Sequence, residues 1–159
     1  MLTEKEKFQV LTGVNNIQKI LDSKKLQSTD EDYKGAFIEI LISLKDLLIK
    51  SDKLLSKRVK FTDDVIIDKD LRINDVTGLI SYFRNCVCHP ETEDADLDSN
   101  TLKYNIFIGI GGISIGDKFI GNKYNDDIGY NMGQHTLLLN RHIIRSFIEV
   151  KNNFQQYLQ

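Results

Sequence analysis

The chain has 159 residues, of which 41% are hydrophobic and 28% charged, and its formal net charge at pH 7 is −2. This length and composition predict one globular domain, residues 1–159, with its own core. No stretch approaches the roughly 20 consecutive apolar residues of a membrane-spanning helix, and the mixed charges of the first residues differ from a secretory signal. We therefore expect a cytoplasmic protein with no membrane partner. The charge balance also excludes a broad basic surface, so contact with RNA would be local.

Hydrophobic periodicity predicts two helices in the first third of the chain. Thr3 and Glu6 form a capping-box pattern ahead of a helix that ends at about residue 21. Apolar residues at steps of three and four predict a second helix over residues 32–55. The charged segment 57–69 is predicted to be a connector.

A third helix is predicted over residues 74–89, because apolar residues from Val76 to Val87 fall on one face. Pro90 disfavours helical backbone at the residue before it, so the helix should end at this point. The acidic stretch 91–100 is predicted to be a polar loop.

After this loop the period changes to that of a β-strand. Apolar residues alternate with other residues over 102–110. Gly111 and Gly112 fit a two-residue hairpin turn with a return strand over 113–115. Further strand is predicted within 128–139.

A last amphipathic helix is predicted over residues 139–157. The expected fold is therefore mainly α: a four-helix bundle with a small antiparallel β-hairpin inserted between the third and fourth helices. The insertion covers about residues 102–139.

The residues with the most chemical content lie at the end of the third predicted helix. Arg84 is followed directly by Asn85, and His89 comes after four intervening residues. A guanidinium is a planar, permanently charged fork that suits phosphate oxygens. An imidazole exchanges protons near neutral pH. Together they supply what metal-free cleavage of RNA requires.

This motif, at the end of the third of four helices, resembles that of the HEPN domain family. In that family an arginine, usually followed by a polar residue, precedes a histidine by about four to six intervening positions. The β segment departs from a plain helical bundle. The resemblance implies a HEPN-like fold for the helices and a ribonuclease whose catalytic residues are Arg84, Asn85 and His89, with no metal and no cofactor.

The resemblance also implies a mechanism and a biological setting. The RNA 2′-hydroxyl would attack the adjacent phosphate and leave a 2′,3′-cyclic phosphate. The protein would act in phage defence, abortive infection or a toxin–antitoxin system, with RNA as substrate and an antitoxin or regulatory protein as a further partner. The typical assembly is a homodimer with a composite active site. Geometry agrees, because Arg84 and His89 point about 140° apart on an ideal helix.

Two alternatives to catalysis remain open. Arg84 and His89 sit where side chains commonly bind the last carbonyls of a helix. The chain could also be a non-catalytic HEPN module that binds a protein partner or a nucleotide in a regulatory role.

Other candidate sites are weaker. Cys86, Cys88 and His89 could bind a metal with His135 or His142, but their spacing is not that of a structural zinc site. Cysteines one residue apart are also unsuited to an intrachain disulfide, and a nucleophilic cysteine lacks an arranged base. The glycine-rich segment 109–116 lacks the residues of a phosphate-binding loop.

Basic residues in two other segments are candidates for contact with the RNA backbone. Solvent-exposed charges would explain both segments equally simply. The candidate RNA-binding residues are Arg141 and Arg145 at the start of the last helix, and Lys57, Arg58 and Lys60 in the connector.

Overall fold

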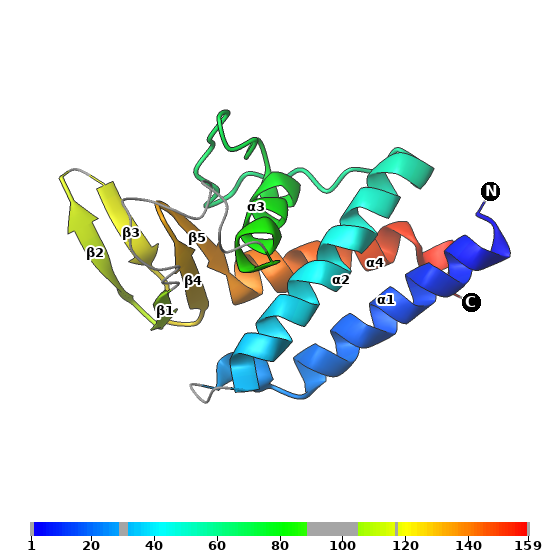
Figure 1. Cartoon of the computed structure of the whole chain (residues 1–159), viewed down its shortest axis with the longest axis horizontal. Coiled ribbons are helices and arrows are strands. Elements are labelled where there is room, and N and C mark those ends of the chain that lie inside the picture. Colours follow the sequence, from blue (N-terminus) through cyan, green and yellow to red (C-terminus); the bar gives the residue numbers. More distant parts are fainter. Residues whose placement is uncertain (1, 29–31, 89–104, 117, 159) are drawn as a thin grey trace.

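Helices and strands occupy different ends of the molecule, and both chain termini lie at the helical end (Figure 1). The computed structural model describes residues 2–28, 32–88, 105–116 and 118–158. The described α-helices are α1 (Glu4–Asp22), α2 (Asp32–Leu55), α3 (Val76–Cys88) and α4 (Arg145–Asn153), and the strands are β1 (Asn105–Ile108), β2 (Gly111–Ile115), β3 (Lys118–Asn122), β4 (Ile128–Met132) and β5 (His135–Leu138).

The first helix begins at the predicted capping box. The Thr3 hydroxyl accepts a hydrogen bond from the Glu6 amide at 3.3 Å, and the Glu6 carboxylate accepts one from the Thr3 amide at 2.7 Å. These two bonds satisfy backbone donors that a helix start otherwise leaves unpaired. The prediction of this helix is confirmed.

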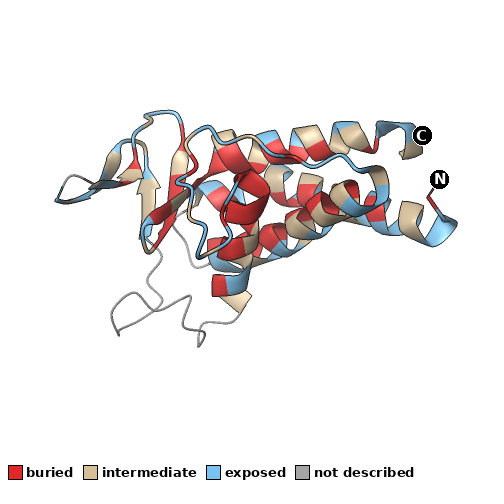
Figure 2. Ribbon diagram, turned by 90° about the horizontal axis from the view of Figure 1, so that it is seen from above, coloured by how far each residue is buried: buried red, intermediate tan, exposed pale blue. Residues whose placement is uncertain are grey.

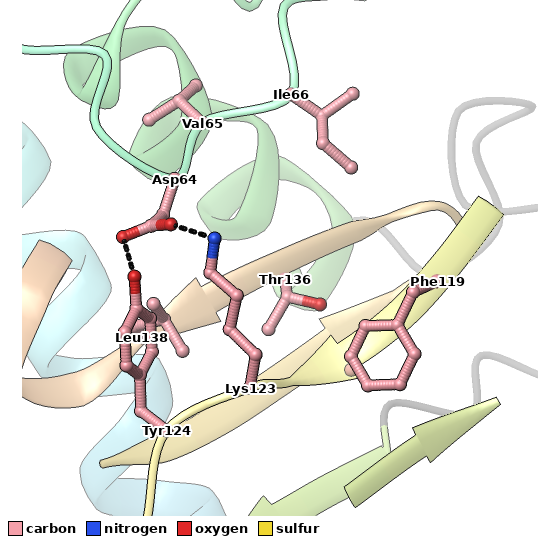
Figure 3. Close-up of a pocket in the computed structure, with 9 residues that line it drawn as sticks. Asp64, Val65, Ile66, Phe119, Lys123, Tyr124, Thr136 and Leu138 are labelled. Atoms are coloured by element: carbon pink, nitrogen blue, oxygen red, sulfur yellow. Dashed lines mark hydrogen bonds and ion pairs between the residues drawn. The ribbon is translucent and has the colours of Figure 1, made fainter. Parts of the chain in front are cut away.

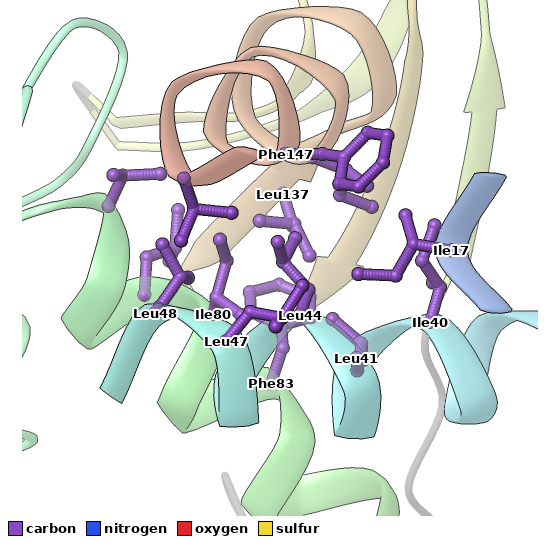
Figure 4. Close-up of a cluster of buried hydrophobic side chains, with 14 of the residues drawn as sticks. Ile17, Ile40, Leu41, Leu44, Leu47, Leu48, Ile80, Phe83, Leu137 and Phe147 are labelled. Atoms are coloured by element: carbon purple, nitrogen blue, oxygen red, sulfur yellow. The ribbon is translucent and has the colours of Figure 1, made fainter. Parts of the chain in front are cut away.

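The second helix, α2, is the centre of the core, and its predicted bounds are confirmed. It packs against α1, α3 and α4. Its apolar residues recur at helical spacing along the buried side, where Figure 4 shows them beside residues of the other helices and of β5. The fully or almost fully buried apolar residues of α2 are Phe37, Ile40, Leu41, Leu44, Leu47 and Leu48.

The third helix begins two residues later than predicted. The Asp75 carboxylate accepts a hydrogen bond from the Gly78 amide at 2.8 Å, as an N-cap residue does. Eight of the thirteen residues of α3 are buried, Phe83 among them. The described helix ends at Cys88, so His89 and the predicted loop 91–100 lie outside the described residues.

The prediction of a single β-hairpin insertion is wrong. The strands that follow α3 form two antiparallel sheets, one in the order β1-β4-β5 and the other made of β2 and β3. Gly111 pairs with Asn122 and Gly112 with Gly121 in the second sheet. The glycines predicted as the turn are therefore the first residues of a strand.

Close backbone approach explains these glycines better than a turn does. A Cβ atom at Gly121 would lie 2.3 Å from the Gly111 oxygen, and one at Gly112 would lie 2.5 Å from the Ile120 oxygen. The chain bends instead at Gly109, which has a φ of +71° and donates a backbone hydrogen bond to Asp127. This bend separates β2 from β1 and leaves β1 to pair with the later strand β4.

The three-stranded sheet is joined to the helices through Tyr130. Its ring stacks on Phe37 of α2 at a centroid distance of 4.2 Å, and its hydroxyl donates to the Leu26 oxygen at 2.7 Å. The β2–β3 pair extends away from this junction and is largely exposed (Figure 2). Four apolar side chains on this pair or just before it in the chain are about half exposed: Ile108, Ile110, Ile113 and Phe119.

The last predicted helix consists of two regular parts. Residues Leu139–Ile144 form a π-helical turn, labelled η3, and α4 continues from Arg145. The predicted buried face is present, with Ile143, Phe147 and Val150 almost fully enclosed.

Candidate functional site

Packing of α3 fixes the direction in which the motif residues point. Phe83 is fully buried in the core, whereas Arg84 is half-buried and Asn85 is exposed. Successive helical residues are about 100° apart, so burial of Phe83 turns the next two side chains toward the outer side of the helix. Arg84 and Asn85 therefore lie together at the surface near the end of α3.

A lysine from α2 joins these two residues. Lys45 Nζ donates to Asn85 Oδ1 at 3.0 Å, and Arg84 Nη1 makes a longer hydrogen bond of 3.4 Å to the same oxygen. One neutral amide oxygen thus accepts from two cations on different helices. Within the described residues neither cation has a carboxylate partner.

The charge of this cluster affects its own ionisation. Burial lowers the pKa of the Lys45 ammonium below its ordinary value, and the positive charge of Arg84 lowers the pKa further. Cys88, four residues after Arg84, has a weaker effect in the opposite direction. The cluster is therefore a place where a bound anion would relieve repulsion between two cations.

The predicted catalytic histidine, His89, lies outside the described residues, so the structure places two of the three predicted catalytic residues. It brings Arg84 and Asn85 together, as expected from their adjacency. The helix-capping alternative finds no support at Arg84 in the described part of the chain, because the guanidinium hydrogen-bonds the Asn85 side chain rather than a carbonyl.

The two arginines at the start of the last helix are held by carboxylates. Arg141 donates to Asp127 at 2.9 Å and to Asp126 at 3.0 Å. Arg145 donates to Asp63 at 2.9 Å. Each guanidinium also lies over an aromatic ring, Tyr124 and Phe61 respectively, at 3.5 Å and 3.8 Å from the ring centroid. These contacts connect the last helix to neighbouring loops and give both predicted RNA-binding arginines a structural role.

The connector residues divide into two kinds. Arg58 forms ion pairs with Asp52 and with the buried Asp75. Lys57 and Lys60 are exposed and, across the described residues, take part in no ion pair. All three line a groove of about 490 Å³. Because Lys57 and Lys60 line this groove without an ion-pair partner among the described residues, they remain candidates for contact with an anionic ligand.

The metal alternative includes His89, which lies outside the described residues. Over those residues no group of three His, Cys, Asp or Glu side chains could hold a metal ion. Cys86 is buried and Cys88 is half-buried, and these two described cysteines are not joined by a disulfide.

Both described histidines are buried, which lowers the pKa of each imidazole. His142 accepts a hydrogen bond at Nδ1 from the Leu138 amide and has Nε2 3.0 Å from the Asp63 oxygen. This arrangement requires a neutral ring with its proton on Nε2. His135 has Nε2 3.5 Å from Asp68. Neither imidazole is presented at the surface as a catalytic histidine would be.

A second cavity, of about 240 Å³, lies between the connector and the sheets (Figure 3). Asp64 projects into it and accepts from Tyr124 Oη at 2.7 Å and from Lys123 Nζ at 2.6 Å. These bonds hold the pKa of Asp64 below its ordinary value, against the effect of burial. The polar groups of this cavity are thus already paired with one another.

Lys45 is the candidate site residue that sequence reasoning missed. Its contact with Asn85 joins residues 40 positions apart, and no local spacing predicts such a contact. One signal was present: positions 41 and 49, one helical turn to either side of Lys45, are both apolar. A lysine without an acidic residue at these positions has no partner on its own helix.

Over the described residues, no helix combines the length and the apolar character needed to cross a bilayer.

Comparison with known proteins adds no family. The chain matches no protein-family model, no curated protein and no solved structure.

Proposed function

We propose that this chain is a metal-independent endoribonuclease whose active site contains Arg84, Asn85 and His89. One observation carries the proposal: Arg84 lies near the end of α3 without a carboxylate partner among the described residues, beside an exposed amide and a second cation. Such a guanidinium is available for forked hydrogen bonds to phosphate oxygens. The resemblance of the motif to that of HEPN domains suggests RNA as the substrate.

In the proposed reaction the RNA 2′-oxygen attacks the adjacent phosphorus, and the bond from phosphorus to the 5′-oxygen breaks. One His89 takes the proton of the 2′-hydroxyl, and a protonated His89 gives a proton to the leaving 5′-oxygen. Arg84 stabilises the charge on the non-bridging phosphate oxygens, while Asn85 hydrogen-bonds the substrate or orients His89. The products are a 2′,3′-cyclic phosphate and a 5′-hydroxyl.

The proposed active form is a homodimer. On a single ideal helix Arg84 and His89 point about 140° apart, so one copy directs them poorly at one phosphate. Two copies related by a two-fold axis would place two arginines and two histidines around a shared groove. Of the basic residues predicted to bind RNA, Lys57 and Lys60 are better suited to backbone contacts than the three ion-paired arginines.

The resemblance further suggests a cytoplasmic effector of phage defence or of a toxin–antitoxin system, controlled by an antitoxin or another regulatory protein. In that setting the protein would be purified together with its regulator, and RNA cleavage would be measured with the regulator present and after its removal.

The test is cleavage of a structured RNA in excess EDTA. Wild type is compared with Arg84→Ala, His89→Ala and Lys53→Ala, the last being an exposed lysine of α2 that serves as a control. Cleavage with 2′,3′-cyclic phosphate ends, lost in the first two variants and kept in the control, supports the proposal. Equal cleavage by all four proteins identifies a contaminant or another site, and contradicts it.

A second candidate function is a non-catalytic module that binds a protein partner. The observation that favours it is the group of half-exposed apolar side chains on and beside the β2–β3 pair, Ile108, Ile110, Ile113 and Phe119. This function would be favoured over catalysis if full-length RNA stays intact in the presence of wild-type protein, both with and without its regulator.

A further inference from the structure

The pairing of two cations through Asn85 has no counterpart elsewhere in the described part of the chain. Lys45 comes from the middle of α2 and Arg84 from the end of α3, and both donate to Asn85 Oδ1. An amide oxygen carries no net charge and cannot neutralise either of them. Two positive charges are therefore held close together, and among the described residues no carboxylate compensates them.

Neither cation has an acidic residue at the spacing of an ion pair within its own helix. On a helix the partners of an ion pair lie three or four residues apart. Lys45 has only apolar residues at these positions, namely Leu41, Ile42, Leu48 and Ile49. Arg84 likewise has no acidic residue there, its neighbours being Ile80, Ser81, Val87 and Cys88.

Several other cations of these helices and of the neighbouring loops do have carboxylate partners. Lys50 on α2 pairs with Asp46, the acidic residue nearest to Lys45 along the helix. Arg58, Arg141 and Arg145 each pair with at least two carboxylates. The Lys45–Arg84 pair thus differs from the ion pairs that serve only to connect elements, and its chemistry matches a dianionic or monoanionic ligand with several oxygens.

We propose that Lys45 completes a phosphate-binding site with Arg84 and Asn85. The ligand is a phosphate group, either on an RNA backbone or free in solution. Its oxygens replace Asn85 Oδ1 as the acceptor for Lys45 Nζ and the Arg84 guanidinium, and the Asn85 amide nitrogen then donates to the same ligand. Lys45 supplies a compact point charge and Arg84 a planar fork. The inference rests on the proposed function in one respect, because both place the substrate phosphate at Arg84.

The ionisation of Lys45 agrees with this geometry. Burial and the neighbouring Arg84 charge both lower the pKa of its ammonium. A bound anion opposes both effects, so phosphate binding should raise the pKa of Lys45. The same linkage means that phosphate binds more weakly once the pH exceeds the pKa of Lys45.

The test measures binding rather than cleavage. Inorganic phosphate and a short all-2′-deoxy oligonucleotide, which lacks the attacking hydroxyl, are titrated into full-length protein followed by NMR or calorimetry. The variants are Lys45→Met, which keeps the aliphatic stem, Lys45→Arg, which keeps the charge, and Lys53→Met as a matched control on α2. We expect Lys45→Met to weaken binding by about tenfold, and the other two to stay within about threefold of wild type.

The outcomes separate this inference from the ribonuclease proposal. Equal binding by wild type and Lys45→Met, with both proteins folded by circular dichroism, overturns the site, and so does a wild type that binds neither probe. The EDTA cleavage assay then decides the ribonuclease proposal independently. Phosphate binding that depends on Lys45, without RNA cleavage, supports the binding site and contradicts the ribonuclease proposal. Tighter binding of the oligonucleotide identifies a backbone phosphate as ligand, whereas tighter binding of inorganic phosphate identifies a free one.

Discussion

The guanidinium of Arg58 holds the carboxylate of Asp75 by two hydrogen bonds, from Nε to Oδ2 at 2.7 Å and from Nη2 to Oδ1 at 3.1 Å. Asp75 is only 6% exposed, and it also accepts a hydrogen bond from the Gly78 amide at the start of α3. The connector is thereby fixed to the helix that carries Arg84 near its other end. Arg58, which the sequence analysis predicted to bind RNA, thus helps to fix the helix on which the candidate site is built.

Replacing Arg58 with alanine should destabilise the protein by about 2 kcal/mol, because it leaves a nearly buried carboxylate without its cation. The loss is smaller than for a fully buried pair, since the Arg58 side chain is 40% exposed. Urea unfolding measures the change. Lys60→Ala, at an exposed position of the same connector, should change stability by less than about 0.5 kcal/mol. Equal effects of the two substitutions would contradict the role given to Asp75.

Replacing Arg84 with lysine should separate binding from catalysis. Lysine keeps the positive charge but loses the planar fork that can hold two phosphate oxygens. We expect the rate constant for RNA cleavage to fall by about a hundredfold, while affinity for inorganic phosphate falls by less than about tenfold. Single-turnover kinetics and a phosphate titration measure the two quantities. A parallel loss of both, or no loss of either, would be inconsistent with a guanidinium that acts in the transition state.

Local patterns predicted the helices well. Thr3 with Glu6 marked the start of α1, and the spacing of apolar residues gave the bounds of α2 as the structure has them. Each of these features depends on residues within one or two turns of each other. Short-range hydrogen bonds and a single buried face decide them, so one sequence is sufficient.

Partner choice among strands was not predictable in the same way. Alternation identified β1 as a strand but carried no information about which strand it pairs with, and its partner β4 lies beyond the β2–β3 pair. Adjacent glycines suit both a hairpin turn and a close strand pair. Lys45 was missed for a related reason, because its position beside Asn85 depends on how two helices pack rather than on the sequence around either residue.

Lowering the pH should destabilise the protein through His142. Burial lowers the folded pKa of this imidazole below its ordinary value of 6.5. The hydrogen bond to the Asp63 oxygen and the charges of Asp64 and Asp127 only partly oppose this effect. Below about pH 6.5 the unfolded chain therefore binds more protons than the folded chain. The free energy of unfolding should fall by up to about 1.4 kcal/mol per pH unit from there down to the folded pKa, while above pH 6.5 the contribution is complete.

Urea unfolding at a series of pH values, with wild type and His142→Gln, measures this dependence. The variant should be less stable near neutral pH but should lose less stability on acidification. His135, whose pKa burial also lowers, leaves a residual dependence in the variant. Identical slopes for the two proteins between about pH 6.5 and pH 5.5 would show that His142 does not titrate as its burial requires.

Alanine substitutions at two glycines test the arrangement of two sheets. Gly121 has a φ of +152°, and a Cβ atom there would lie 2.3 Å from the Gly111 oxygen, so Gly121→Ala should destabilise the protein by about 2 kcal/mol or more. At Gly35 in α2 an added Cβ meets nothing within 4 Å, so Gly35→Ala should stabilise by about 0.5–1 kcal/mol. Thermal unfolding distinguishes the two signs. In a single hairpin turning at Gly111 and Gly112, Gly121 would face no strand, and its substitution would be tolerated as well as that of Gly35.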